Sequence, residues 1–125
     1  MTFRTVRAIG LKLPAVEEST MYGTPALKLG GRLIACIASN KSAEPGTLVV
    51  RTDFEQRDML IEEEPDTYYL KDHYKTFPVV LVRLSRVNAD AMRDLLPAAH
   101  RMVSAGPQKK KPRPRARPRL LRTPK

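Results

Sequence analysis

The 125-residue chain has a formal net charge of +10, and most of that charge lies at one end. Residues 104–125, the tail, hold four Lys, five Arg and no acidic residue, whereas residues 1–103, the body, carry 14 basic and all 13 acidic side chains. The single cysteine excludes an internal disulfide framework and favours a reducing, cytoplasmic compartment. No stretch is long and apolar enough to predict a membrane span. We expect one domain in the body, which is long enough to bury a core unaided.

The first half of the body predicts one helix followed by three strands. Apolar side chains recur at helical spacing over residues 3–13 before Pro14, which is unfavourable inside a helix. Gly30 and Gly31 supply the positive φ angles that a two-residue hairpin turn needs, so the apolar residues on either side predict two antiparallel strands. The β-branched residues in the stretch 47–52 predict a third strand.

A second helix is predicted directly after this third strand. Asp53 is placed to cap it, with Gln56 three residues later in the capping-box position. The helix should run to Glu63, because Pro65 stops it. The apolar side chains that this helix offers for burial are Phe54, Leu60 and Ile61.

The rest of the body predicts two strands and a last helix. Residues 67–70 indicate a short strand, residues 71–78 a turn, and residues 79–87 a mostly apolar strand that we expect at a central position in the sheet. Asn88 is placed to cap a helix with apolar residues at helical spacing. Pro97 lies within it and costs about 3 kcal/mol in a helix interior, so we expect a kink or a break there.

The order of these elements predicts the fold class. A helix, three strands, a helix, two strands and a helix do not alternate strictly, as a doubly wound parallel sheet requires. The sequence therefore predicts an α+β domain, in which one mainly antiparallel sheet carries helices packed on one face.

The body resembles the MmcQ/YjbR family of small bacterial proteins. The resemblance is carried by the stretches "EESTMYGTPALKLGGRLIACI", "TLVVRTDFEQRDMLIEEEPDTYYLKDHY" and "FPVVLVRLSRV", and it spans nearly all of the body but not the tail. It implies a single α/β domain with a double-wing, frataxin-like fold, and it implies DNA binding. It implies no catalytic residue. Pro97 departs from the uninterrupted final helix that is usual in the family.

The tail predicts contacts with nucleic acid. Residues 114–118 resemble the Pro-Arg-Gly-Arg-Pro core of an AT-hook, with Ala116 in place of Gly, and extended Arg side chains suit the narrow minor groove of A·T-rich DNA. A disordered basic tail that contacts phosphates without sequence preference is the first alternative, and a tail that only improves solubility is the second. The candidate contact residues are Lys109, Lys110, Lys111, Arg113, Arg115, Arg117, Arg119 and Arg122.

A second set of candidate nucleic-acid contacts lies in the body. The predicted turn 71–78 places an aromatic ring among positive charges, as a DNA-binding wing would, and Arg residues end the neighbouring strands. Alternatively, Tyr74 and Phe77 close the core and His73 forms only local hydrogen bonds. The candidates are Arg51, Lys71, His73, Tyr74, Lys75, Arg83 and Arg86.

These observations predict a non-enzymatic DNA-binding protein, which would be associated with the nucleoid in the cytoplasm. The alternative is a protein- or small-ligand-binding module that uses a groove edged by Tyr22 and Tyr74, with an incidental tail. No cofactor is expected, because the chain lacks a Gly-rich phosphate loop and a Cys/His pattern with zinc spacing. The acidic residues near the end of the second helix are read as a solvated helix end rather than a metal site.

Overall fold

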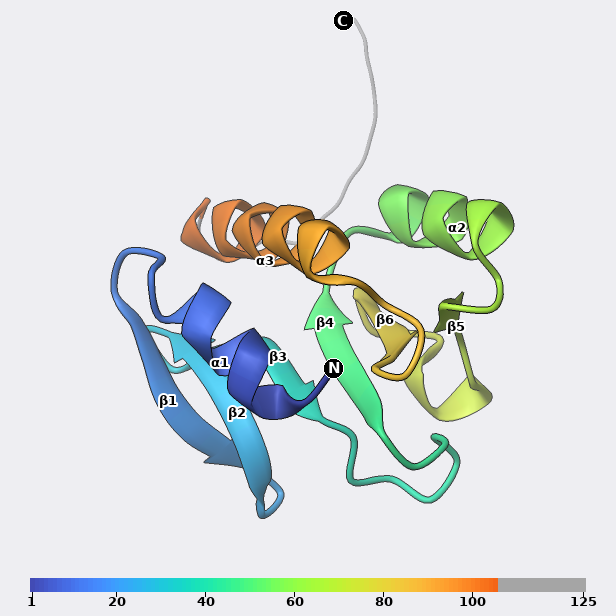
Figure 1. Ribbon diagram of the computed structural model, residues 1–125, viewed down its shortest axis with the longest axis horizontal. Helices are drawn as coiled ribbons and strands as arrows, with labels where there is room; N and C mark the ends of the chain where they lie inside the picture. Colours follow the sequence, from blue (N-terminus) through green and yellow to red (C-terminus); the bar gives the residue numbers. More distant parts are fainter. Residues whose placement is uncertain (106–125) are drawn as a thin grey trace, which may run out of the picture.

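The computed structural model describes residues 1–105, which form one six-stranded sheet and three α-helices (Figure 1). The predictions for Lys109 to Arg122, and for disorder in the tail, lie outside the described residues. The elements in chain order are α1 (Phe3–Gly10), β1 (Val16–Met21), β2 (Thr24–Leu29), β3 (Arg32–Ile37), β4 (Thr47–Arg51), α2 (Phe54–Glu63), β5 (Tyr68–Tyr69), the short 3-10 helix η1 (Asp72–Tyr74), β6 (Val79–Arg83) and α3 (Ala89–Ser104).

The sheet is antiparallel throughout, with the strand order β1-β2-β3-β4-β6-β5. This confirms the predicted α+β class with a mainly antiparallel sheet. The strand expected at a central position, β6, pairs on both sides but lies next to the edge, because its second neighbour β5 contributes only Tyr68 and Tyr69. It also ends at Arg83, four residues earlier than expected.

The edge strand β1 was not predicted. Its sequence, VEESTM, contains two glutamates, and only Val16 is buried, so it lacks the apolar alternation that identifies a strand. A tight turn at Tyr22 (φ 52°) and Gly23 (φ 82°) pairs β1 along the whole length of β2. The hairpin expected at Gly30 and Gly31 is confirmed, with φ angles of 59° and 81°.

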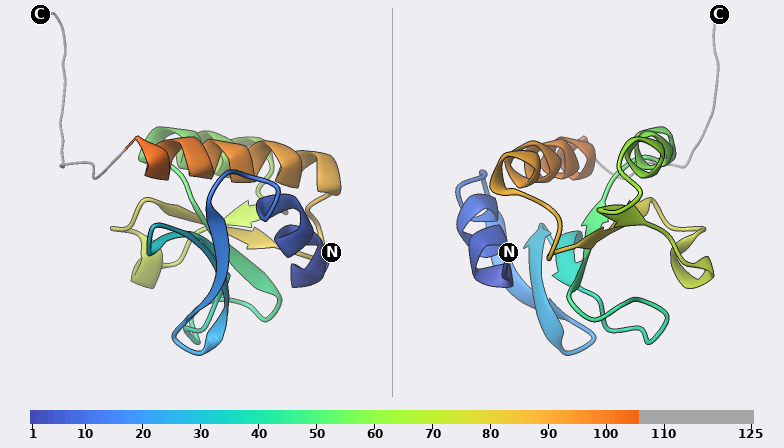
Figure 2. Two further views of the ribbon diagram at one scale, coloured as in Figure 1. Left: turned by 90° about the vertical axis from the view of Figure 1, so that its left-hand side faces the viewer. Right: turned by 45° about the vertical axis from the view of Figure 1, so that its right-hand side comes forward.

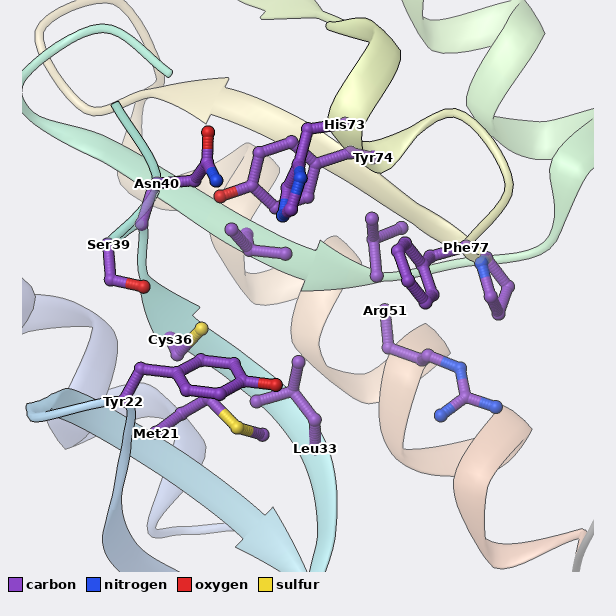
Figure 3. A pocket seen from close by; sticks show the side chains of 14 residues that line it. Met21, Tyr22, Leu33, Cys36, Ser39, Asn40, Arg51, His73, Tyr74 and Phe77 are labelled. Atoms are coloured by element: carbon purple, nitrogen blue, oxygen red, sulfur yellow. The ribbon is translucent and has the colours of Figure 1, made fainter. Parts of the chain in front are cut away.

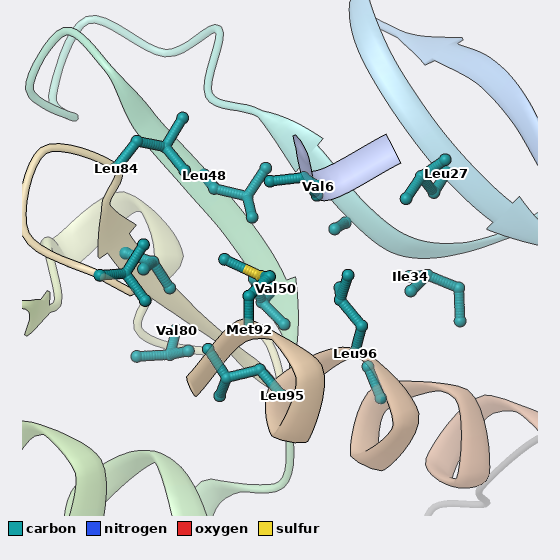
Figure 4. Close-up of a cluster of buried hydrophobic side chains, with 14 of the residues drawn as sticks. Val6, Leu27, Ile34, Leu48, Val50, Val80, Leu84, Met92, Leu95 and Leu96 are labelled. Atoms are coloured by element: carbon teal, nitrogen blue, oxygen red, sulfur yellow. The ribbon is translucent and has the colours of Figure 1, made fainter. Parts of the chain in front are cut away.

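All three helices pack on the same face of the sheet, as the views in Figure 2 show. The main hydrophobic core lies between this face and the helices. Along β4 and β6, every second side chain enters this core, while the residues between them face the opposite side. The fully buried members of this core include Val6, Leu27, Ile34, Leu48, Val50, Val80, Met92 and Leu96 (Figure 4).

The last helix continues through its proline. Pro97 lies inside α3, which runs without interruption from Ala89 to Ser104, so of the predicted kink or break the break is excluded. Apolar side chains on both sides of the proline, among them Leu96 and Ala99, are completely buried in the same core. Their burial offsets the backbone hydrogen bond that the proline removes.

Helix capping was predicted correctly for two helices, and burial was predicted wrongly for one residue. The Oδ1 atom of Asp53 accepts a hydrogen bond from the Gln56 amide at 2.7 Å, and Asn88 caps α3 in the same way. On α2, Phe54 was expected to be buried but is 46% exposed. The helix instead buries Arg57, whose guanidinium stacks on the Phe54 ring.

Candidate functional site

The face of the sheet opposite the helices carries an apolar groove with a volume of about 820 Å³. A second, smaller hydrophobic cluster lies on this face and includes Cys36, Val49 and Val79, one residue from each of β3, β4 and β6. No helix among the described residues covers these side chains, apart from the short η1 at one side. The side chains of this cluster therefore form the floor of an accessible groove.

Two walls of different origin enclose the groove (Figure 3). One wall comes from the β1–β2 hairpin and the start of β3, and it contains Met21, Tyr22 and Leu33. The other comes from η1 and the segment before β6. There His73 packs edge-on against Tyr74, with ring centroids 4.9 Å apart, and Phe77 follows.

The two ends of the groove differ in polarity. Ser39 and Asn40, which follow β3, lie at one end and offer a hydroxyl and an amide group. Arg51, the last residue of β4, lies at the other end beside Phe77 (Figure 3). The described residues that line the groove include Arg51 and His73 but no Asp or Glu, so any charge that this lining carries is positive.

Arg51 lacks the partners that a partly buried arginine normally has. Its Nε atom is buried and has no hydrogen-bond partner, and the side chain forms no ion pair within residues 1–105. Desolvation lowers the pKa of its guanidinium, and the positive charge of Arg32 lowers it further. An anion placed here could accept hydrogen bonds from the terminal nitrogens of the guanidinium and offset the repulsion between the two arginines.

The thiol of Cys36 on the groove floor is protonated at neutral pH. Burial raises its pKa from 9.0 to about 11, although the nearby charge of Lys28 acts in the opposite direction. Only the thiolate is a good nucleophile, so this cysteine serves as an apolar surface rather than as a reactive group. Burial likewise raises the pKa of the Tyr74 hydroxyl, and a hydrogen bond from the Asn40 backbone partly opposes this shift.

Tyr22 combines high exposure with an unusual backbone conformation. Its side chain is 86% exposed at the rim of the groove, and its φ angle of 52° lies in the left-handed region. Tight hairpin turns of this kind favour Asn or Gly at that position. The groove edge that the sequence predicted at Tyr22 and Tyr74 thus corresponds to two residues on opposite walls of one groove.

The turn residues predicted to contact nucleic acid are mostly accessible. Lys71, His73 and Lys75 are exposed on and around η1. Tyr74, in contrast, is buried in the smaller cluster, as the alternative reading of this turn predicted. The same reading placed Phe77 in the core, which is wrong, because Phe77 is 52% exposed.

Arg83 is fully engaged within the fold. Its Nη2 atom lies 2.8 Å from the Oε2 atom of Glu44, and its Nη1 atom donates to the carbonyls of Pro65 and Asp66. The guanidinium carbon also lies 4.2 Å from the centroid of the Tyr69 ring. These contacts give Arg83 a structural role in holding the loops at this end of the sheet.

Arg51 and Arg83, two of the predicted nucleic-acid contacts, lie at opposite ends of the same strand pair. Arg51 pairs with Val79 at one end of β4 and β6, whereas Arg83 pairs with Thr47 at the other end, and Arg86 lies beyond it. The two ends lie four positions apart along the strand, a distance of about 13 Å. On the hairpin, Arg32 donates a hydrogen bond to the Val103 carbonyl at 3.0 Å.

Residues 1–105 contain neither a metal-ligand cluster nor a helix that could span a membrane. No group of three or more His, Cys, Asp or Glu side chains is placed to hold a metal ion in this part of the chain. The helices described here include none that is both long and apolar enough to cross a membrane.

Comparison with known proteins identifies the family. A solved structure, that of the Deinococcus radiodurans protein DR2400 with its DUF419 domain, superposes on this chain with a TM-score of 0.67 and 23% identity, covering 82% of this chain and 78% of that one. No curated protein matches the chain. The family model named YjbR matches residues 11–102, which include every strand of the sheet and the groove. The chain therefore belongs to the YjbR family.

Proposed function

We propose that this chain is a non-enzymatic DNA-binding protein whose affinity comes largely from residues 104–125. The observation that carries the proposal is the separation of charge along the sequence: the tail has nine basic residues and no acid, and the body is almost neutral. Each phosphate that a basic side chain neutralises releases counterions, so such a tail binds duplex DNA with a strong dependence on salt.

The arrangement of the body supports a leading role for the tail. Arg83 is engaged by Glu44, and it lies at the opposite end of β4 and β6 from Arg51, so these two candidates do not form one basic patch. Lys71 and Lys75 remain exposed on the turn beside the groove. They are the body residues best placed for an additional phosphate contact.

A salt titration of duplex binding tests this proposal. We expect log Kd to vary steeply with the logarithm of the salt concentration for the full chain. In a variant with Gln at Arg113, Arg115, Arg117 and Arg119, the magnitude of this slope should fall by about 3 to 4, because each phosphate contact contributes about 0.9. The control K71Q/K75Q should change it by less than about 2. A slope near zero for the full chain would contradict the proposal.

The same titration distinguishes two forms of tail binding. If the Pro114–Pro118 segment enters the minor groove, A·T-rich duplexes bind more tightly than G·C-rich duplexes of the same length. If the tail contacts only phosphates, the two duplexes bind equally. Replacing Ala116 by Gly should strengthen any A·T preference, because it removes the methyl group from a groove only about 6 Å wide.

A second candidate function is a ligand-binding module, and the groove favours it. Its volume of about 820 Å³ lies within the range of about 300–1,000 Å³ that is typical of small-molecule sites. Such sites combine an apolar lining with a few polar groups, which here are Arg51 at one end and Ser39 with Asn40 at the other. This function is compatible with DNA binding by the tail, because the two use different parts of the chain.

A further inference from the structure

The composition of the groove floor favours a ligand with an apolar part. Cys36, Val49 and Val79 present aliphatic and thiol surface, and the protonated thiol of Cys36 adds no charge. Water in a groove of this composition lies against apolar side chains. Covering these side chains with an apolar group is therefore favourable. A strongly polar ligand, such as a sugar, would leave its hydroxyl groups without partners on this floor.

The Arg51 end selects a negative charge. The guanidinium is partly desolvated, it forms no ion pair within residues 1–105, and the like charge of Arg32 is nearby. No acidic side chain of the described residues lines the groove to neutralise it. The planar fork of an arginine matches a carboxylate, which accepts two parallel hydrogen bonds from it.

We infer that the groove binds a small amphipathic acid. Its carboxylate lies on Arg51, and its apolar or aromatic part lies over the sheet toward Tyr22 and Tyr74. This inference rests on the second candidate function, ligand binding in the groove, and it specifies the chemical class and orientation of the ligand. A single carboxylate is favoured over a phosphate monoester, because a dianion would require cationic donors beyond the one arginine in the lining.

The aromatic residues at the rim complete the site. Tyr22 and Phe77 are 86% and 52% exposed, and they lie on opposite walls. Their rings are free to fold over an apolar ligand and exclude water from it. At the far end, Asn40 and Ser39 offer hydrogen bonds to a polar substituent on a longer ligand.

The charge of the groove argues against the basic tail as its occupant. The tail carries nine positive charges, and the lining of the groove contributes the positive charge of Arg51 without any acid. Like charges would be brought together in a partly desolvated place, which is unfavourable. An anionic small molecule has the complementary charge.

The test uses the full chain and two probes of nearly equal shape, 4-phenylbutyrate and its neutral amide, 4-phenylbutyramide. Binding is followed by backbone amide shifts in NMR spectra, with attention to Cys36 and Val49 on the floor. We expect the acid to bind about tenfold more tightly than the amide, and both to shift the floor amides. The variant R51Q should remove this preference, and R51K should retain only part of it, because lysine lacks the planar fork.

Arg86→Gln is the matched control, because it removes the same charge at an exposed site that does not line the groove. It should leave the preference for the acid unchanged, and far-UV circular dichroism should show that all three variants fold. If acid and amide bind the floor equally, the groove binds ligands but the inferred acid selectivity is wrong. If neither probe shifts the floor amides, or the acid shifts only tail amides, ligand binding in the groove is itself overturned.

Discussion

The Nη1 atom of Arg57 lies 3.2 Å from the carbonyl oxygen of Phe77. This contact joins α2, which packs on the helix-bearing face of the sheet, to a wall of the groove on the other face. The same Nη1 atom donates to the carbonyl of Lys75 at 3.1 Å, and Arg57 is only 7% exposed. The buried Arg57 therefore holds the backbone of the groove wall that contains Phe77.

Replacing Arg57 by Met should destabilise the protein by about 2–3 kcal/mol, because charged hydrogen bonds to two carbonyls are lost while the apolar stem is kept. Urea unfolding measures this change, and the amide signals of Phe77 should shift in the folded state. The control is R93M, which breaks an exposed ion pair with Asp90 and should cost less than about 0.5 kcal/mol. Equal costs for the two variants would contradict this role of Arg57.

Gly10, the last residue of α1, should not tolerate a side chain. A Cβ atom built there overlaps with Cδ1 of Leu27, which is completely buried, and lies 3.8 Å from Cδ1 of Leu96. We expect Gly10→Ala to lower the free energy of unfolding by about 1–2 kcal/mol through overpacking. In a Leu27→Val background, which removes the overlapping atom, the penalty should fall below about 0.5 kcal/mol. Additive effects of the two substitutions would refute this explanation.

The left-handed conformation of Tyr22 should cost stability that an asparagine would recover. Tyr22→Asn places Asn before Gly23 in a turn where both φ angles are positive, and we expect a gain of about 0.5–1 kcal/mol in thermal or urea unfolding. Ala15→Asn is a matched control, because Ala15 has a φ of 62° and does not line the groove. Both variants should be more stable, but only Y22N should bind 4-phenylbutyrate more weakly. A loss of stability in Y22N would contradict the prediction.

Burial of Cys36 should make part of the stability depend on alkaline pH. Because burial raises the thiol pKa from 9.0 to about 11, the folded state keeps its proton at pH values where the unfolded chain releases it. This contribution is complete below about pH 9 and is lost as the pH rises toward 11. The difference in unfolding free energy between the wild type and C36A should therefore fall by roughly 1 kcal/mol from pH 9 to pH 10. A constant difference over that interval would show that the thiol is not shielded.

The sequence predicted the elements that have strong local signals. Asp53 and Asn88 were recognised as helix caps because the cap hydrogen bond is formed within three residues, and Gly30-Gly31 because a hairpin turn needs positive φ angles. The strand β1 was missed because its stability comes from pairing with β2 rather than from its own side chains. The helix continues through Pro97 because the burial around it outweighs the local cost of the proline, which the local sequence pattern does not reveal.

The candidate site could be predicted only in part. Tyr22 and Tyr74 were proposed as edges of one groove, and they line it. The role of Arg51 depends on the register that places it opposite Val79 and on the absence of an acid nearby, and neither property is visible in a single sequence. The sequence offered one signal for the position of Arg51. Side chains alternate along a strand, so Arg51 lies on the same face as Val49 and opposite to Val50.

The two faces of the sheet place neighbouring residues under different packing constraints. Val49 and Val50 are consecutive residues. Val50 is buried under the helices, whereas Val49 lies on the floor of the groove. Replacements at Val50 are limited by packing, whereas replacements at Val49 change mainly what the groove accepts. Substitutions at groove positions can in this way alter the surface of the groove while the architecture beneath it stays the same.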